Sequence, residues 1–269
     1  MMIDIHAHLL PGVDDGADTL SESLAMIRRA QQQGIQGIIL TPHFYPDNDM
    51  ASSIDKNKII LQELKQAVRA AGLEIFLFLG NEVFYSQDTL EQLEKGYYTT
   101  LNNSRYLLVE TMRHSLDCYS FTVFLNQLRL RGYIPILAHP ERYEFIQNDP
   151  NILVRLIQDG NLAQLNLLSL IGHYGSDAQA TAEILLTHNM VHFLASDAHA
   201  IKAYERFGAA LDEARKLVGE KRVAKLLEEN PKRVLVNEKI ETMEPCYYEE
   251  VPQRKKSLLG IWKKQVQIG

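Results

Sequence analysis

The chain is poor in cysteine: Cys118 and Cys246 are the two thiols among its 269 residues. Two cysteines are too few for a disulfide framework, so we expect a reducing, cytoplasmic environment. The first residues carry no basic stretch followed by a long apolar run, so no secretory signal is apparent. Runs of about 18 apolar residues, the length that suggests a membrane-spanning helix, are missing as well. Positive charge is not in excess either: the formal net charge is -6, which argues against a general nucleic-acid binder.

What the chain does have is a series of short apolar runs separated by helix-like segments. The runs are continuous rather than alternating, which is typical of strands buried on both faces. Repeated alternation of strand and helix predicts a parallel sheet with right-handed crossovers. The expected strands are 3–7, 38–41, 75–79, 106–109, 134–138, 162–166 and 191–195, and the expected helices lie near 19–33, 53–71, 120–131, 150–159, 176–187, 203–218 and 220–229.

Side chains that bind metals follow these apolar runs with regularity. Imidazole nitrogen and carboxylate oxygen are common ligands of divalent metals. These residues stand at or just past the ends of six of the seven runs. An open parallel sheet would instead draw its site from a few strand ends at one switch point. Six contributing strands suit the mouth of a TIM-like barrel, so we predict an α/β fold, a distorted (β/α)7 barrel that forms a single domain over residues 1–240. The candidate ligands are His6, His8, Asp14, His43, Glu82, Glu110, His139, Asp197 and His199.

Local spacing supports a shared site for these residues. His6 and His8 are two residues apart, so on an extended strand their side chains share one face. The prolines beside His43 and His139 stiffen the backbone that carries each imidazole. Each feature alone has an ordinary structural interpretation, such as a turn at 14–16. Together they predict a polynuclear metal site.

Five short strings form a recognisable set: DIHAH at 4–8, PGVDDG at 11–16, TPH at 41–43, AHPER at 138–142 and ASDAH at 195–199. They resemble the PHP (polymerase and histidinol phosphatase) superfamily. Within it the chain is most similar to the bacterial manganese-dependent protein-tyrosine phosphatases of capsule and exopolysaccharide operons. The resemblance covers about residues 2–237, and its most specific strings are PGVDDG and HPER.

The resemblance implies three divalent ions in the barrel mouth. It assigns one ion to His6, His8 and Asp197, with Glu82 bridging to a second ion that Glu110 and His139 complete. It assigns the third ion to Asp14, His43 and His199, and it makes Arg142 the catalytic residue that binds phosphate. Ligation by oxygen and imidazole without thiolate favours Mn²⁺, with Fe and Zn as alternatives.

The chain departs from the family pattern after His199. The family usually continues with asparagine and has a second arginine five residues after the histidine, but Ala200 and Tyr204 occupy these positions here. Lys202 and Arg206 are candidates to replace that arginine. Arg113 and Tyr85 are further candidates for substrate binding, and His114 is another residue near the expected pocket.

The implied reaction is hydrolysis of phosphotyrosine in a protein by a metal-activated hydroxide. Coordination lowers the pKa of water to about 7, and a phenol with a pKa of about 10 leaves more easily than an alkyl alcohol. A thiol-based mechanism is excluded, because it needs an arginine six residues after its cysteine, where this chain has Phe124 and Pro252. The alternatives are a small-molecule phosphomonoesterase such as a histidinol-phosphate phosphatase, a PHP nuclease or editing domain, and a non-catalytic binding module.

The resemblance also implies a partner, a membrane-associated tyrosine autokinase that controls capsular or extracellular polysaccharide synthesis. The alternation of strands and helices stops near Pro245, and residues 241–269 form a linker followed by a short basic and apolar segment around Trp262. Such a segment is able to lie on an anionic membrane surface, and a docked or frayed tail is the alternative. We expect a cytoplasmic protein, with the inner face of the membrane as a candidate location.

Overall fold

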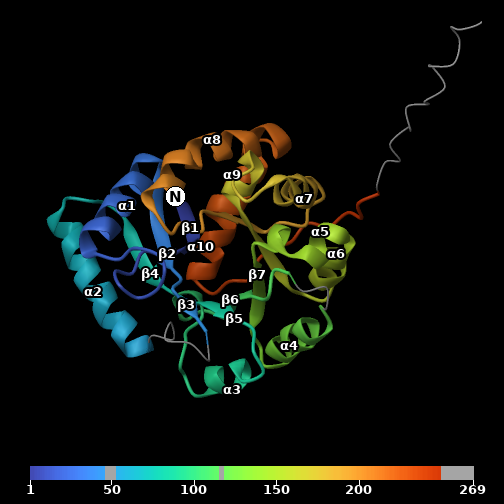
Figure 1. Ribbon diagram of the computed structural model, residues 1–269, viewed down its shortest axis with the longest axis horizontal. Helices are drawn as coiled ribbons and strands as arrows, with labels where there is room; N and C mark the ends of the chain where they lie inside the picture. Colours follow the sequence, from blue (N-terminus) through green and yellow to red (C-terminus); the bar gives the residue numbers. More distant parts are fainter. Residues whose placement is uncertain (46–52, 115–117, 250–269) are drawn as a thin grey trace, which may run out of the picture.

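The computed structural model describes residues 1–45, 53–114 and 118–249. Within these residues parallel strands form a ring in the middle of the molecule, and most of the helices surround it (Figure 1). The strands are β1 Met2–Ala7, β2 Ile35–Leu40, β3 His43–Phe44, β4 Phe76–Leu79, β5 Glu82–Phe84, β6 Tyr106–Glu110, β7 Ile134–Ala138, β8 Leu162–Asn166 and β9 Phe193–Ala195.

Two of the barrel strands are interrupted near their carboxyl ends. Hydrogen bonding gives one sheet in the order β1-β2-β4 and another in the order β3-β5-β6-β7-β8-β9. β3 follows β2 after a break of two residues, and β5 follows β4 in the same way. The two interrupted strands remain paired across the breaks, because Gly80 N donates to Leu40 O at 2.8 Å and Glu82 N donates to Pro42 O at 3.2 Å. The two short strands were not predicted, since two or three residues show no period.

The ring closes between β1 and the chain that follows β9. Ala7 pairs with Ala198, His8 N donates to Ala198 O at 3.0 Å, and Asp197 N donates to His6 O at 2.9 Å. Counting β2 with β3 and β4 with β5 as single interrupted strands, the described residues form seven barrel strands. The predicted α/β barrel is therefore confirmed.

The helices begin and end close to where the sequence places them. Thr19 accepts a hydrogen bond from Glu22 N at 3.2 Å and caps the first helix, as its sequence pattern predicts. The helices of five or six residues at 89–94, 144–148 and 230–235 were not predicted, because they are too short to show a helical period. The helices are α1 Leu20–Gln32, α2 Ile54–Ala70, α3 Thr89–Glu94, α4 Tyr119–Leu130, α5 Glu144–Asn148, α6 Asn151–Gln158, α7 Ser176–Thr187, α8 Ile201–Val218, α9 Glu220–Ala224 and α10 Asn230–Leu235.

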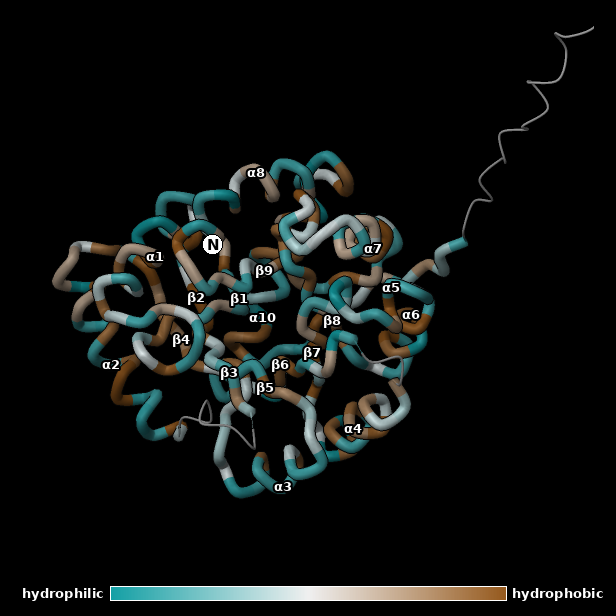
Figure 2. The backbone as a smooth tube through the Cα atoms, viewed as in Figure 1, coloured by the Kyte–Doolittle hydropathy of each residue, from teal (hydrophilic) through white to brown (hydrophobic). Residues whose placement is uncertain are grey.

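Both faces of the strands are buried, which explains their continuous apolar sequences. Alternate residues of one strand join two different clusters: Leu107 and Val109 pack with the helices, whereas Tyr106 and Leu108 pack inside the ring. Val234 of α10 belongs to the interior cluster, and Figure 1 shows α10 within the ring. Outer helices such as α2 and α4 alternate between hydrophobic and hydrophilic residues along their length (Figure 2). The apolar interior leaves the carboxyl ends of the strands for polar groups.

The last described residues, 241–249, form neither helix nor strand. They are held against the barrel through Cys246 N, which donates to His188 O at 2.9 Å, and through Tyr248, whose N–H donates to Asn151 Oδ1 at 2.8 Å. The basic segment around Trp262 lies outside the described residues. Across the part of the chain that is described, every helix is too short or too polar to cross a bilayer.

Candidate metal centre

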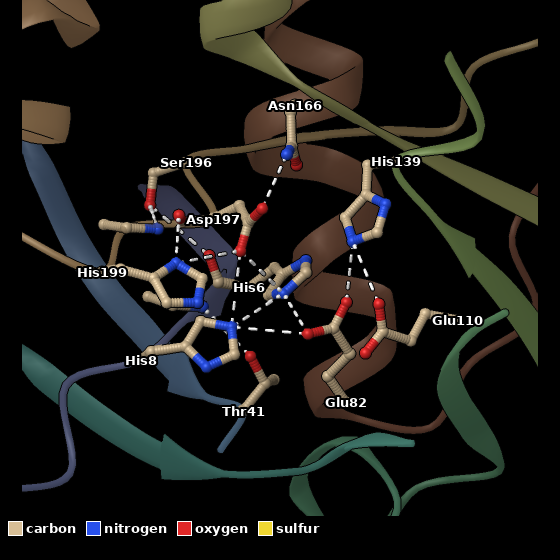
Figure 3. A network of polar contacts seen from close by, with 12 residues as sticks. His6, His8, Thr41, Glu82, Glu110, His139, Asn166, Ser196, Asp197 and His199 are labelled. Carbon is tan, nitrogen blue, oxygen red and sulfur yellow. Dashed lines mark hydrogen bonds and ion pairs between the residues drawn. The ribbon is translucent and has the colours of Figure 1, made fainter. Parts of the chain in front are cut away.

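Almost all of the candidate ligands gather at the carboxyl ends of the barrel strands (Figure 3). His6 lies near the end of β1 and His8 just after it; His43 begins β3 and Glu82 begins β5; Glu110 ends β6; His139 follows β7; Asp197 and His199 follow β9. Most of these side chains are buried, and His199, at 32% exposure, is the most accessible of this group. The barrel therefore brings together residues that are up to 193 positions apart, from His6 to His199.

The innermost group consists of His6, His8, Glu82 and Asp197. His6 Nε2 lies 3.1 Å from His8 Nε2, 3.2 Å from Glu82 Oε2 and 3.3 Å from Asp197 Oδ1. His8 Nε2 lies 3.5 Å and 3.4 Å from the same two oxygens. Two nitrogens and two carboxylate oxygens thus face one point.

Neighbouring groups fix which nitrogen of each imidazole carries its proton. His6 Nδ1 is 2.8 Å from Gln164 Oε1, and His8 Nδ1 is 2.7 Å from Asp14 Oδ2. Both partners are acceptors, so each Nδ1 donates and each neutral imidazole presents a lone pair at Nε2. Facing lone pairs and anionic oxygens repel one another unless a cation lies between them. This is the arrangement in which outer hydrogen bonds orient metal-binding histidines.

The second group surrounds the two oxygens of Glu82. Its Oε1 lies 2.9 Å from His139 Nε2, and its Oε2 lies 3.0 Å from His43 Nδ1. Glu110 faces the same two histidines at longer distances: its Oε2 lies 3.8 Å from His139 Nε2, and its Oε1 lies 3.4 Å from His43 Nδ1. Tyr45 donates to Glu110 Oε1 at 2.7 Å and holds this carboxylate in place. Glu82 is therefore placed to face two cations at once.

The outer group brings Asp15, rather than Asp14, together with His8, His43 and His199. Asp15 Oδ1 lies 3.4 Å from His43 Nε2 and 3.3 Å from His199 Nε2. Asp14 accepts from His8 Nδ1, His43 N and Gly16 N, so both of its oxygens are already engaged. In the structure Asp14 therefore orients His8, and its neighbour Asp15, rather than the predicted Asp14, faces the site.

The residues present fit bound cations. In the described part of the chain, His43 Nδ1, Glu82 Oε2 and Asp197 Oδ1 are buried without a hydrogen-bond partner. Leaving buried polar atoms unpaired is costly, and each of these atoms points at another potential ligand. A set of oxygens and imidazole nitrogens without thiolate suits divalent first-row metals.

Opposite charges in the centre stabilise one another. Burial alone would lower the pKa of His8, but the Asp14 carboxylate raises it well above its ordinary value. Burial is likewise outweighed at His43, where Glu82 raises the pKa. Hydrogen bonds from His199 and His43 lower the pKa of Asp15. The Asp14 and Glu82 carboxylates thus favour a positive charge at these imidazoles, which a proton supplies without a metal and which a bound cation would supply in its place.

The backbone at two of these positions is strained. His139 has φ of 36° and Asp197 has φ of 50°, in the left-handed region that residues other than glycine rarely adopt. Such conformations persist when the surrounding structure holds them, and they gather at functional sites. Both residues turn the chain sharply at the end of a strand, which aims their side chains into the centre.

Arg142 adjoins the innermost group. Its Nη1 donates to Asp197 Oδ2 at 3.0 Å, and its guanidinium carbon lies 4.2 Å from the centre of the Tyr174 ring. The turn that carries it is anchored by Glu141, whose Oε1 accepts from Ser169 Oγ at 2.7 Å and Asn166 N at 3.1 Å. A cavity of about 210 Å³ lies beside these groups and is lined by Asp15, His43, Glu82, Arg113, His139, Arg142, Tyr174, Asp197 and His199.

The other predicted substrate contacts divide into two classes. Arg113 lines the cavity and His114 lines a neighbouring groove. Lys202 and Arg206 lie on α8 and do not line the cavity, and Arg206 instead contacts His173 Nδ1 at 3.2 Å. The Tyr85 ring packs 4.9 Å from the ring of Phe124 and is not part of the cavity wall. The structure thus leaves Arg113 and Arg142 as the arginines at the centre.

β8, the one barrel strand for which the sequence analysis predicted no ligand, also contributes polar side chains to the centre. Gln164 on β8 contacts His6, and its Nε2 donates to Asn166 Oδ1 at 2.9 Å. Asn166 Nδ2 in turn donates to Asp197 Oδ2 at 2.7 Å. The polar positions 164 and 166 inside a buried strand were the signal for this. Tyr174, whose ring packs against Arg142, lies in the loop before α7, where no sequence pattern marked it.

Comparisons with known proteins agree on one family. A family model described as capsular polysaccharide synthesis, CpsB/CapC, matches residues 2–236. The chain is 35% identical over 208 residues to the tyrosine-protein phosphatase YwqE of Bacillus subtilis (strain 168), covering 75% of this chain and 78% of YwqE. It is 30% identical over 247 residues to the tyrosine-protein phosphatase CpsB of Streptococcus pneumoniae, covering 89% of this chain and 100% of CpsB.

A comparison with solved structures indicates the same family. A chain from the crystal structures of YwqE and CpsB, described as unique metal-dependent tyrosine phosphatases, matches with a TM-score of 0.84 and 31% identity. The match covers 92% of this chain and 100% of that chain. The similarity therefore extends over the whole barrel.

Proposed function

Because this chain belongs to the CpsB/CapC family of capsular polysaccharide synthesis and is a metal-dependent tyrosine phosphatase of that family, we propose that its buried centre is where phosphotyrosine is hydrolysed. The observation that carries the proposal is the pair of lone-pair nitrogens, His6 Nε2 and His8 Nε2, 3.1 Å apart beside two carboxylates and Arg142. The family match favours this function over the small-molecule phosphomonoesterase, the nuclease and the binding module that the sequence left open.

The three groups of side chains would hold the ions. The first ion would be held by His6, His8, Glu82 and Asp197. The second would be held by Glu82, Glu110 and His139, with His43 nearby. The third would be held by Asp15, His43 and His199, together with His8. We propose Mn²⁺ as the native metal, with Fe and Zn as alternatives, on the basis of the oxygen and imidazole ligands. When bound, such ions supply Lewis acidity and a water of lowered pKa as the nucleophile.

The residues of the chain itself bind and orient the phosphate. The Arg142 guanidinium is fixed between Asp197 and the Tyr174 ring, so its remaining N–H groups are preorganised to donate to phosphoryl oxygens. Fixed positive charge at those oxygens stabilises the transition state of phosphoryl transfer. A phenol leaving group has a pKa of about 10, so its departure makes a smaller demand on a general acid than an alkyl alcohol does.

Chelation followed by addition of single metals tests the proposal. We expect the chelated protein to lose turnover of a phosphotyrosine peptide and to regain the most with Mn²⁺, with metal content measured in parallel. His6→Ala and Asp197→Ala should abolish turnover and lower the bound metal. Full turnover by protein that is free of metal would contradict the proposal.

We further propose that the substrate is a membrane-associated tyrosine autokinase of polysaccharide synthesis, and that the enzyme acts in the cytoplasm at the inner face of the membrane. The family's link to capsule synthesis and the basic residues around Trp262 support this. Sedimentation with phosphatidylglycerol vesicles should decrease when residues 250–269 are removed. Equal sedimentation of the two proteins would exclude the tail as a membrane contact.

A further inference from the structure

A groove much larger than the catalytic cavity opens beside it. Its volume is about 1070 Å³, and it runs along α5, α6 and α7 to Tyr248. Arg113, Arg142 and Tyr174 line both the groove and the catalytic cavity, so the two are continuous. The catalytic cavity, at about 210 Å³, is smaller than the roughly 300–1,000 Å³ of pockets that enclose a whole small-molecule ligand. A substrate whose phosphate reaches the ions therefore extends into the groove.

The groove already holds extended polypeptide at one end. Asn151 Nδ2 donates to Tyr248 O at 3.0 Å, and Tyr248 N donates to Asn151 Oδ1 at 2.8 Å. One side-chain amide thus pairs with both backbone groups of a single residue. Two residues earlier, Cys246 N donates to His188 O at 2.9 Å. The pairing with Tyr248 shows that Asn151, in the part of the groove wall where α6 begins, is able to bind a main chain.

The rest of the groove wall is rich in hydrogen-bonding side chains. Gln147 and Asn148 on α5 and Ser176 on α7 line it, and the end shared with the catalytic cavity carries two arginines. Sites for small ligands are mostly apolar. A polar groove with a basic end instead suits a peptide backbone that leads to a phosphorylated side chain.

We propose that this groove binds the extended polypeptide on one side of the phosphotyrosine. This inference rests on the proposed function of the metal centre and adds a substrate determinant outside it. An extended chain advances about 3.3–3.6 Å per residue, so several residues contact the groove while the phosphate lies at the ions. The enzyme is then selective for a phosphorylated polypeptide over a free aryl phosphate.

Filling the groove tests this without touching the centre. Ala180 is an exposed residue of α7 that lines the groove, and Ala180→Trp would obstruct it. Ala209 is an exposed residue of α8 that does not line the groove, so Ala209→Trp is the matched control. Both variants are assayed as full chains with metal, on p-nitrophenyl phosphate and on phosphotyrosine peptides extended by four residues on one side, on the other side, or on both.

We expect Ala180→Trp to lower kcat/KM at least tenfold for peptides extended on the side that the groove binds, with less than a twofold change for p-nitrophenyl phosphate and none for Ala209→Trp. Unchanged turnover of every peptide would overturn the proposal, as would equal losses on peptide and p-nitrophenyl phosphate. Faster peptide turnover would also overturn it and assign the groove to the protein's own C-terminal residues. If wild type hydrolyses p-nitrophenyl phosphate but no phosphotyrosine peptide, the proposed function fails, which is a different outcome.

Discussion

Arg142 and His6 lie against opposite oxygens of one carboxylate, that of Asp197. Arg142 Nη1 donates to Oδ2 at 3.0 Å, whereas His6 Nε2 faces Oδ1 at 3.3 Å. Asn166 Nδ2 also donates to Oδ2, at 2.7 Å. A single side chain therefore links the arginine proposed to bind phosphate with the residues proposed to hold the ions.

Arg142→Ala should weaken phosphate binding while leaving the ions in place. Asn166 still holds Asp197 in this variant, so metal content should match wild type. Loss of a hydrogen bond to a charged group costs about 1.5–3 kcal/mol, so kcat/KM for a phosphotyrosine peptide should fall roughly 10- to 100-fold, mainly through KM. Arg206→Ala is the control and should change little, because Arg206 contacts His173 rather than the cavity. A loss of metal from Arg142→Ala would make Arg142 structural.

Asp15→Asn and Asp14→Asn should separate a ligand from a residue that orients a ligand. We expect Asp15→Asn to bind one ion fewer, because its oxygen faces His43 and His199. We expect Asp14→Asn to keep all of the ions with affinity lowered roughly 10- to 100-fold, as for other outer-sphere partners. Titration with Mn²⁺ and analysis of metal content measure both. The reverse pattern would restore Asp14 as the ligand.

The barrel could be predicted because its signals are repeated along the chain. Each of the seven barrel strands contains an apolar run of several residues. His6, His43, Glu82, Glu110, His139 and Asp197 each stand near the carboxyl end of such a run. The geometry of parallel strands then brings those ends together without any information from loops. Since that argument needs the order of residues alone, the clustering of the candidate ligands at the barrel mouth followed from the sequence.

The choice between neighbouring residues could not be predicted. Asp14 and Asp15 are identical in type and adjacent, and the direction of each depends on the loop geometry. The candidate substrate residues Arg206 and Lys202 are a similar case: they are close to His199 in sequence, but they lie on α8 and do not line the cavity. Loops and helix faces depend on tertiary packing, which local patterns do not encode.

Tyr204→Phe should lower stability without changing substrate binding. Tyr204 takes the place of the family's second arginine, and it is fully buried, with its hydroxyl donating to Asp4 Oδ2 at 2.9 Å. Removing one donor from a buried carboxylate should reduce the free energy of unfolding by about 1–3 kcal/mol. Urea unfolding measures the loss. KM for the phosphotyrosine peptide should stay within twofold of wild type, and a larger rise would mean that position 204 contributes to the substrate site.

His192 should make the protein less stable in mild acid. Burial lowers its pKa to about 3, and Arg222 and Lys225 add to the effect. Between pH 6.5 and 3 the unfolded chain therefore binds a proton that the folded chain does not, so stability falls as the pH falls, by up to about 1.4 kcal/mol per unit. His192→Asn keeps an acceptor for Ala163 N, which donates to His192 Nδ1 at 3.2 Å. From pH 6.5 to 5 wild type should lose about 1–2 kcal/mol more than this variant in urea unfolding, and parallel losses would contradict the prediction.

Gly16→Ala should displace the loop that carries Asp14 and Asp15. A Cβ atom on Gly16 would lie 2.0 Å from His8 O and 2.6 Å from His8 Cβ, so the loop cannot keep its contact with β1. Movement of the loop separates Asp14 from His8 Nδ1 and Asp15 from His43 and His199. We therefore expect weaker binding of the outer ion and lower kcat on the phosphotyrosine peptide, both measured against Gly208→Ala. Gly208 lies within α8, and a Cβ atom there meets the terminal oxygen of Gln33 at 3.0 Å, which is able to move. Alanine favours helix by about 0.5–1 kcal/mol over glycine, so the control variant should stay folded and keep its metal and activity. If Gly16→Ala bound metal with wild-type affinity, the loop would not position the outer ligands.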